Sequence, residues 1–294
     1  MNRRLFPTRL LAFTLLTSTV ALAQGAPPIR SVIRPVLNMY SSPTTDADVV
    51  SQAIYATSVG VLEEKGGWAR IRTPDDYTGW VESNALVAPP GGPYGSGKNT
   101  VIQVRSLFAH IYREASVTKH APMLTVPFET TLEMDGADAR KSERWIQVRL
   151  PDGRTGLIQA GDVGPVAASL SVAETIELAK KFLGLPYTWG GTSSYGFDCS
   201  GFTQMLMRQR GYVMPRDAGP QARWERFAAV EKADLQPGDV LFFGSAPEKI
   251  THTGMYIGDG LFINATTHET PMVRIDNLNE AYWTKLFVGA RRVK

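Results

Sequence analysis

The only cysteine among the 294 residues, Cys199, lies in the segment YGFDCSGFTQMLM, where it opens a predicted helix. Asp198 before it is a typical N-cap residue, and Phe202 and Leu206 give the helix an apolar side. Unpaired N–H groups and a partial positive charge at a helix N-terminus stabilise a thiolate and lower the pKa of the thiol. Small polar neighbours and the preceding loop TSSYG favour an accessible thiol over a buried structural one. Cys199 is therefore predicted to be a nucleophile.

A cysteine nucleophile needs a base and a group that orients the base. His252 begins the strand-like run HTGMYI, which continues through GDG into LFINA. If residues 258–260 form a three-residue hairpin loop, Gly254 faces Asn264, and His252 lies diagonal to Asn264 on the same face of the sheet. Gly254 then leaves room for the imidazole. The chain order Cys199, His252, Asn264 is that of a papain-like triad, in which an amide oxygen holds the imidazole in its useful tautomer.

The other three histidines are weaker candidates for the base. His268 follows the predicted strand in TTHETP, which has the composition of a turn, so it is the alternative base. His110 and His120 belong to an earlier, β-rich part of the chain, where we expect ordinary surface or turn residues.

The region around Cys199 has an α+β pattern. Ser171 and Glu174 have the spacing of a capping box, and apolar positions predict a helix over residues 172–183 that ends at Gly184. The helix that contains Cys199 is expected to end at Gly211. Strand-like runs follow, namely VLFFG, TGMYIG, LFINAT, MVRI and FVGARRV. Helices followed by antiparallel strands define an α+β domain.

The first half of the chain contains a repeat with an offset of 77 residues. Residues 66–86 align with residues 142–163, and each copy has a Trp-led alternating strand, a Pro-Asp turn and a Gly-led strand. Short alternating runs precede each copy. This predicts two small all-β barrels, at residues 30–88 and 100–164, joined by a Pro- and Gly-rich linker at 89–99.

Residues 1–23 have the pattern of an export signal, with three arginines, an apolar run and the cleavage motif ALA. We therefore expect an exported chain, periplasmic or secreted after signal-peptide removal, without a membrane span. Removing these arginines leaves 28 basic against 28 acidic residues, which argues against a nucleic-acid partner. No metal-ligand spacing, P-loop or dinucleotide motif is present, so no metal or other cofactor is predicted. The oligomeric state stays open.

The segments PYTWGGTSSYGFDCSGF, MPRDAGPQ, LQPGDVLFFG, THTGMYIGDGLFINATTH and ARRV resemble the NlpC-type (NlpC/p60) cell-wall cysteine peptidases. The two β units resemble bacterial SH3-like domains. The combination is similar to the subgroup that cleaves the bond between γ-D-glutamate and the diamino acid of murein stem peptides. The resemblance implies a papain-like catalytic domain at residues 170–294, with peptidoglycan stem peptides or muropeptides as partners.

The resemblance also implies functions for the central residues. Cys199 would attack the amide carbon through a thioester intermediate, and its backbone N–H would contribute to an oxyanion hole. His252 would shuttle the proton, and Asn264 would orient His252. The family commonly has histidine in the third place, so Asn264 departs from its pattern.

Substrate contacts follow from the same resemblance. Tyr187 would line the site, and Asp198 and Ser200 would hold the free amine of an N-terminal L-alanine. Packing is the alternative function for Tyr187, and helix capping is the alternative for Asp198 and Ser200. Tyr77 matches a tyrosine with which the first SH3-like domain closes the cleft, and its acidic partner is not identifiable. Arg216 and Asp217, in PRDA, match scaffold positions.

Two other classes of function remain open. The chain could be a non-catalytic wall-binding protein that has two SH3-like modules and a decayed enzyme domain. It could also be an amidase or acyltransferase on the same scaffold, because a thioester can pass to water or to another acceptor.

Overall fold

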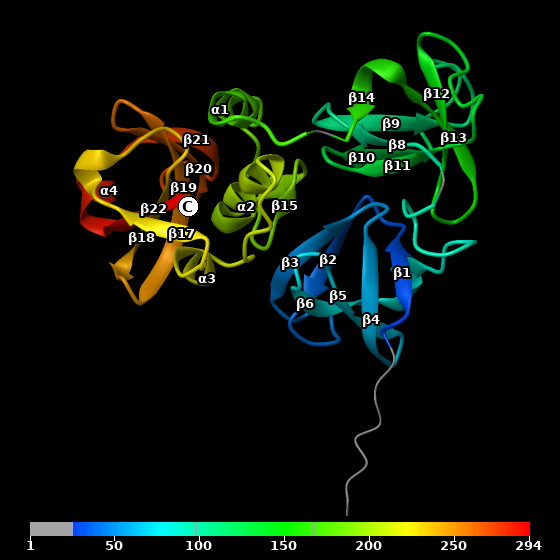
Figure 1. The fold of residues 1–294 in the computed structure, drawn as a ribbon. Coiled ribbons are helices and arrows are strands. Elements are labelled where there is room, and N and C mark those ends of the chain that lie inside the picture. The colour runs from blue at the N-terminus through cyan, green and yellow to red at the C-terminus, as the bar shows by residue number, and fades with distance from the viewer. Residues whose placement is uncertain (1–25, 98, 167) are drawn as a thin grey trace, which may run out of the picture.

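The computed structural model describes residues 26–97, 99–166 and 168–294 (Figure 1). The predicted export signal lies outside the described residues. Within the described part of the chain, no helix is long and apolar enough to cross a membrane.

The N-terminal part folds into a seven-stranded antiparallel sheet with the order β3-β2-β6-β5-β4-β1-β7. Its elements are β1 (Ile29–Val32), β2 (Val36–Tyr40), β3 (Val49–Ile54), β4 (Ser58–Lys65), β5 (Trp68–Arg72), β6 (Thr78–Glu82), a 3-10 turn at Ser83–Ala85 and β7 (Leu86–Val87).

A second seven-stranded sheet follows, with the order β10-β9-β13-β12-β11-β8-β14. Its elements are β8 (Val101–Val104), β9 (Phe108–Tyr112), β10 (Leu124–Pro127), β11 (Thr131–Met134), β12 (Trp145–Arg149), β13 (Thr155–Gln159), a 3-10 turn at Ala160–Asp162 and β14 (Val163–Pro165). Each label is seven higher than its counterpart in the first sheet, so the sequence repeat is also a structural repeat.

The glycine in the second position of β6 and the matching glycine of β13 are both required by packing. A Cβ on Gly79 of β6 would lie 2.9 Å from Cβ of Met39 on β2, and one on Gly156 of β13 would lie closer still to Ile111 on β9. Strands cross too closely at both places for any side chain.

Two helices follow the repeat. The capping box of Ser171 and Glu174 is formed, but α1 (Val172–Lys180) ends three residues before the predicted end, and single turns lead from it to Gly184 at φ +85°. Helix α2 (Cys199–Gln209) begins at Cys199 and is followed by Gly211 at φ +85°, as predicted. The short strands β15 (Thr192–Ser193) and β16 (Gly196–Phe197) pair just before α2.

The last part of the chain forms a six-stranded antiparallel sheet with the order β17-β22-β18-β19-β20-β21. The five predicted strands are present, and α3, β17 and α4 were not predicted. The elements are α3 (Ala218–Ala222), β17 (Phe227–Val230), a 3-10 turn at Lys232–Asp234, β18 (Val240–Ala246), β19 (Lys249–Gly258), β20 (Leu261–Thr266), β21 (Met272–Asn277), α4 (Ala281–Leu286) and β22 (Phe287–Val293).

The β19–β20 hairpin differs from the prediction at its tip. Its loop has two residues, Asp259 and Gly260, both with positive φ, as a tight Asp-Gly hairpin turn requires, so the predicted three-residue loop is wrong. Ile257 forms a bulge, because Tyr256 pairs with Phe262 while Gly258 pairs with Leu261. The bulge supplies the residue that the loop lacks, so the register further along the strands is the predicted one.

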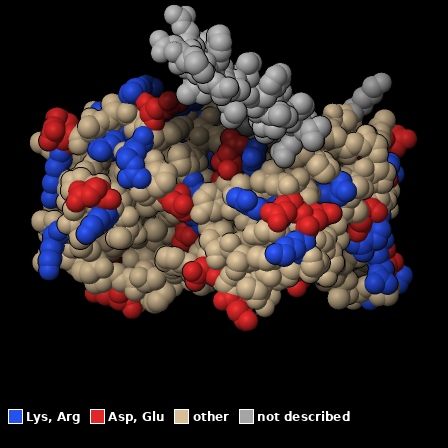
Figure 2. Space-filling view, turned by 90° about the horizontal axis from the view of Figure 1, so that it is seen from below, with Lys and Arg blue, Asp and Glu red and all other residues tan. Residues whose placement is uncertain are grey.

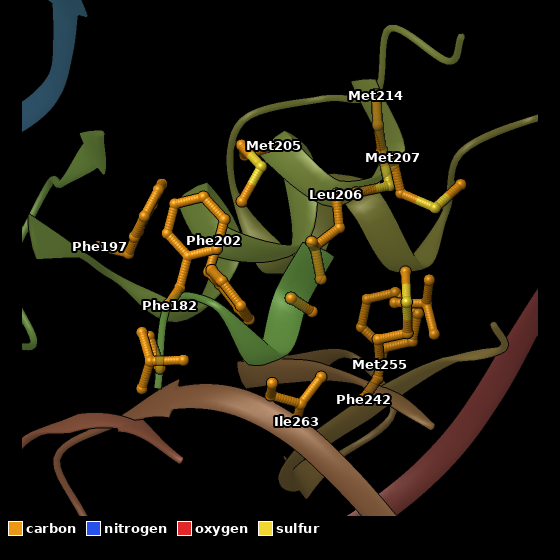
Figure 3. Close-up of a cluster of buried hydrophobic side chains, with 14 of the residues drawn as sticks. Phe182, Phe197, Phe202, Met205, Leu206, Met207, Met214, Phe242, Met255 and Ile263 are labelled. Carbon is orange, nitrogen blue, oxygen red and sulfur yellow. The ribbon is translucent and has the colours of Figure 1, made fainter. Parts of the chain in front are cut away.

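Helix α2 lies between this sheet and the two N-terminal sheets (Figure 1). Its apolar side chains, Phe202, Met205 and Leu206, join Phe242 and Ile263 of the sheet in a fully buried cluster (Figure 3). On the face shown in Figure 2, cationic and anionic side chains are interspersed rather than segregated.

Candidate active site

Cys199 is the first residue of α2, and Asp198 is its N-cap. The Asp198 side chain accepts a hydrogen bond of 2.7 Å from the backbone N–H of Gly201. The thiol lies against β19, where Sγ is 4.0 Å from the carbonyl oxygen of Thr251 and the backbone N–H of Thr253 lowers its pKa. These two backbone groups flank His252, so the chain brings the predicted nucleophile beside the predicted base.

The expected accessibility of the thiol is wrong, because Cys199 is only 8% exposed. The loop that precedes it is covered by both N-terminal sheets. The backbone N–H of Thr192 donates to the side chain of Gln52 at 3.1 Å, and the Ser194 hydroxyl accepts from the N–H of Phe128 at 3.1 Å. The composition of the loop carries no signal of this long-range packing.

The expected low pKa of the thiol is wrong as well. Burial and, to a smaller extent, the negative charge of Asp198 raise the pKa of Cys199 from 9.0 to about 12. The backbone N–H of Ser200 at the helix start acts in the predicted direction, but its effect is smaller. In the free protein the thiol is therefore protonated at neutral pH.

His252 and Asn264 meet as the predicted register requires. His252 Nε2 lies 2.8 Å from Asn264 Oδ1. A Cβ on Gly254 would lie 2.9 Å from Cβ of Asn264, which places Gly254 directly opposite Asn264. The bare backbone of Gly254 gives the imidazole its room, and the Nδ1 nitrogen of His252 stays available to a thiol.

An aromatic wall lies behind the imidazole. Trp283 of α4 stacks on His252 with ring centroids 5.1 Å apart, and Phe243 of β18 is 5.7 Å away. Burial lowers the pKa of His252 from 6.5 to about 4, against the opposing effects of Asn264 and Asp276. The base is thus neutral at pH 7 and can accept a proton. Sequence reasoning missed Trp283, because a six-residue helix has too few residues to show periodicity.

This pKa predicts an unusual acid limit of activity. The imidazole accepts a proton only when it is neutral, that is, above its pKa, so a depressed pKa extends the active range toward acid. We expect kcat/KM, which reports ionisations of the free enzyme, to hold down to about pH 5 and to fall with a midpoint near pH 4. An acid limb with its midpoint at the ordinary histidine value of 6.5 would contradict a base whose pKa is lowered by its surroundings.

The alternative base, His268, contacts Tyr282 and Trp283 of α4. Its ring stacks on Tyr282 at 3.7 Å and meets Trp283 edge-on at 5.6 Å. His110 of β9 bonds to the hydroxyl of Thr125 on β10, and His120 pairs with Glu114 in the exposed connection between these two strands. These positions agree with surface or turn residues for His110 and His120.

A buried ion pair holds the start of α2. Arg216 Nη2 lies 2.6 Å from Asp198 Oδ2, and Nη1 donates to Asp198 Oδ1 at 3.0 Å and to the Ser200 hydroxyl at 2.8 Å. The Arg216 side chain is 1% exposed. Nε donates to the hydroxyl of Ser51 in β3, so the N-terminal sheet joins this network. Asp198 therefore caps α2, and Arg216 joins this cap to β3.

Tyr77 and Tyr187 reach the same region from different parts of the chain. The Tyr77 hydroxyl lies 3.1 Å from Asp217 Oδ2, at the start of α3. Burial and Asp217 raise the pKa of Tyr77 to about 12. Tyr187 forms a bridge with Phe197, two residues before Cys199, and burial raises the pKa of the Tyr187 hydroxyl. Asp217 was predicted as scaffold, and its bond to Tyr77 was missed because the partners are 140 residues apart.

Comparisons with known proteins agree with this arrangement. The NlpC/P60 family matches residues 184–292, and the bacterial SH3 domain matches residues 35–87. A curated relative from Bacillus cereus, named gamma-D-glutamyl-L-lysine dipeptidyl-peptidase, is 33% identical over 82% of this chain and 74% of its own length. A Bacillus subtilis protein of the same name is 29% identical over 84% and 82%.

A solved structure of an NlpC/P60 family protein from Bacillus cereus superimposes with a TM-score of 0.78 at 26% identity, covering 90% of this chain and 99% of the other. Fold and relatives together define a peptidase. The chain belongs to the NlpC/P60 family.

Proposed function

We propose that the protein is a cysteine peptidase that hydrolyses the bond between γ-D-glutamate and the diamino acid of murein stem peptides. The observation that carries the proposal is the Cys199 thiol held against the strand that bears His252, with Asn264 bonded to Nε2 of that histidine. Cys199 attacks the amide carbon as His252 accepts its proton, and the imidazolium gives that proton to the amine of the diamino acid, which leaves as the amide C–N bond breaks. Water, deprotonated by His252, then hydrolyses the thioester and releases the D-glutamate carboxylate and the thiol. Since thiol and imidazole are both neutral at rest, proton transfer accompanies the attack.

We propose that both N-terminal sheets are SH3-like barrels, at residues 30–88 and 100–164, in front of a papain-like domain at residues 170–294. The bacterial SH3 match over 35–87 and the identical strand order of the second sheet support this. The first barrel shapes the site, since Tyr77 and Ser51 contact Asp217 and Arg216.

A substrate with a free N-terminal amine fits the exposed side of this site. Asp198 is 7% exposed, and both its oxygens are already bonded to Arg216, which leaves it as cap and support. Asp217 has only the Tyr77 hydroxyl as a side-chain partner within the described residues, and it lines a groove with Tyr77 and Trp224. We therefore propose that Tyr77 and Asp217 receive the amine of L-alanine, and that Tyr187 lines the neighbouring wall.

The test is incubation with defined muropeptides, followed by mass analysis of the products. We expect the cut between D-glutamate and the diamino acid when the L-alanine amine is free, and at least about tenfold slower cleavage when it is acetylated, because a charge-assisted bond is lost. The control Asp217→Asn should lose most of that preference.

Other outcomes separate the alternatives. Binding without cleavage would indicate a wall-binding protein. Cleavage of another bond would indicate an amidase or acyltransferase. Equal cleavage rates on free and acetylated substrates would contradict only the proposed amine site at Tyr77 and Asp217, and not the peptidase assignment.

A further inference from the structure

We propose that Asp276 is a positioning residue of the catalytic machinery, which holds the amide of Asn264 in the single orientation that presents its oxygen to His252. The proposal deepens the cysteine-peptidase function argued above and rests on it. The side chains of Asn264 and His252 lie between the Asp276 carboxylate and the Cys199 thiol. Asp276 is on β21, whereas Asn264 is on β20 and His252 on β19.

The sheet register places the two residues together. Asn264 pairs with Arg274, and Phe262 pairs with Asp276, so Asp276 lies diagonal to Asn264 on the same face of the sheet. Asn264 Nδ2 donates to Asp276 Oδ2 at 2.8 Å and to the carbonyl oxygen of Arg274 at 3.4 Å. The amide nitrogen thus faces two acceptors, while Oδ1 faces His252 Nε2 at 2.8 Å.

An asparagine needs such a support more than a carboxylate does. The two ends of its amide have nearly the same shape, so a flipped Asn264 would fit the same space and present its NH₂ group to the imidazole. An ionised carboxylate only accepts hydrogen bonds, so a flipped Asn264 would set its oxygen against an oxygen of Asp276. Asp276 therefore excludes the flipped state.

The orientation of the amide decides the tautomer of the base. Oδ1 of Asn264 accepts, so Nε2 of His252 must carry the hydrogen, and Nδ1 keeps the lone pair that can take a proton from Cys199. A flipped amide would favour the opposite tautomer, in which Nδ1 carries a hydrogen and cannot accept. Asp276 thus acts on the chemistry through Asn264, without touching the reacting atoms.

Asp276 is itself held in place. Its side chain is 1% exposed, and Oδ1 lies 2.9 Å from Nη2 of Arg274, whose Nη1 is 3.0 Å from Glu269 on the surface. A buried charge requires such a partner. Asp276 on β21 and Asp198 before α2 are the acidic groups whose charges act on His252, and both favour the imidazolium that forms during attack. Cys199 is the titratable group at the start of α2, and α4 and β18 contribute the aromatic rings of Trp283 and Phe243.

The variant Asp276→Asn tests the proposal, because a side-chain amide can accept or donate and no longer excludes a flipped Asn264. We expect kcat to fall about ten- to a hundredfold, the range for groups that orient a functional ligand, with KM changed less than about twofold. The matched rescue is the double variant Asn264→Asp/Asp276→Asn, which exchanges the two side chains and preserves charge and volume. Its carboxylate at 264 presents an acceptor to Nε2 in either orientation, so most of kcat should return.

A second measurement does not depend on turnover, and its wild-type half does not depend on any variant folding. The ¹⁵N chemical shifts of His252 in the wild-type protein should show the Nε2–H tautomer, and Asp276→Asn should show a mixture. A wild-type protein with the Nδ1–H tautomer, unchanged kcat in Asp276→Asn, or a loss that the exchanged double variant does not repair would each overturn the proposal. The tautomer of His252 and the relative kcat of the variants do not depend on which bond of the substrate is cut. A wrong substrate assignment would therefore leave the test of Asp276 valid.

Discussion

Replacing Cys199 with alanine should reduce hydrolysis of muropeptides by about 10⁴-fold or more, because the covalent route through a thioester disappears. Cys199 is the only cysteine of the chain, so no second thiol can substitute. His252 and Asn264 stay bonded to each other in the variant, but without a nucleophile the imidazole has no thiol to activate. The measurement is the initial rate of product formation, followed by mass analysis.

The matched control is Cys199→Ser, which keeps the size of the side chain and a hydroxyl. Since a hydroxyl is a much weaker nucleophile than a thiol near neutral pH, its rate should lie close to that of the alanine variant. Both variants should melt within a few degrees of wild type, which shows that the fold is intact. Substantial hydrolysis by Cys199→Ala would mean that another group performs the attack, and the assignment of Cys199 would be wrong.

The identity and order of the site residues could be predicted because their geometry is local. Cys199 is placed by one helix start, and His252 and Asn264 by one hairpin whose register follows from glycine positions and alternation. The bulge at Ile257 could not be predicted from the pattern, yet it left the register at Gly254 unchanged. The helix start and the hairpin register, both readable from short segments of sequence, thus predict which residues form the site.

Burial and charge could not be predicted, because they depend on segments far apart in the chain. The low exposure of Cys199 comes from two β units that cover the loop before it through Gln52 and Phe128. The lowered pKa of His252 comes from burial, and the ring of Trp283 that stacks on it belongs to a helix too short to be recognised. The helix start alone predicts a reactive thiolate, but the desolvation that long-range packing imposes is the larger effect.

The ion pair between Asp198 and Arg216 carries the second large effect. Replacing Arg216 with methionine should lower the free energy of unfolding by about 3–5 kcal/mol, because it leaves the Asp198 carboxylate buried without a counter-charge. Arg216 is 1% exposed at its side chain and bonds both oxygens of Asp198, the cap of the helix that begins at Cys199. Urea unfolding followed by tryptophan fluorescence measures the loss.

The double variant Asp198→Asn/Arg216→Met distinguishes a stranded charge from lost packing. Asparagine still caps a helix, and no buried charge remains, so the double variant should recover most of the stability lost in the single one. If it is as unstable as Arg216→Met alone, the loss comes from the packing of the guanidinium against Ser51 and Ser200 instead. If stability recovers, the loss in Arg216→Met comes from the unpaired Asp198 carboxylate. The main function of Arg216 is then to neutralise this carboxylate, which caps α2 beside the nucleophile where the N-terminal sheet meets the helix.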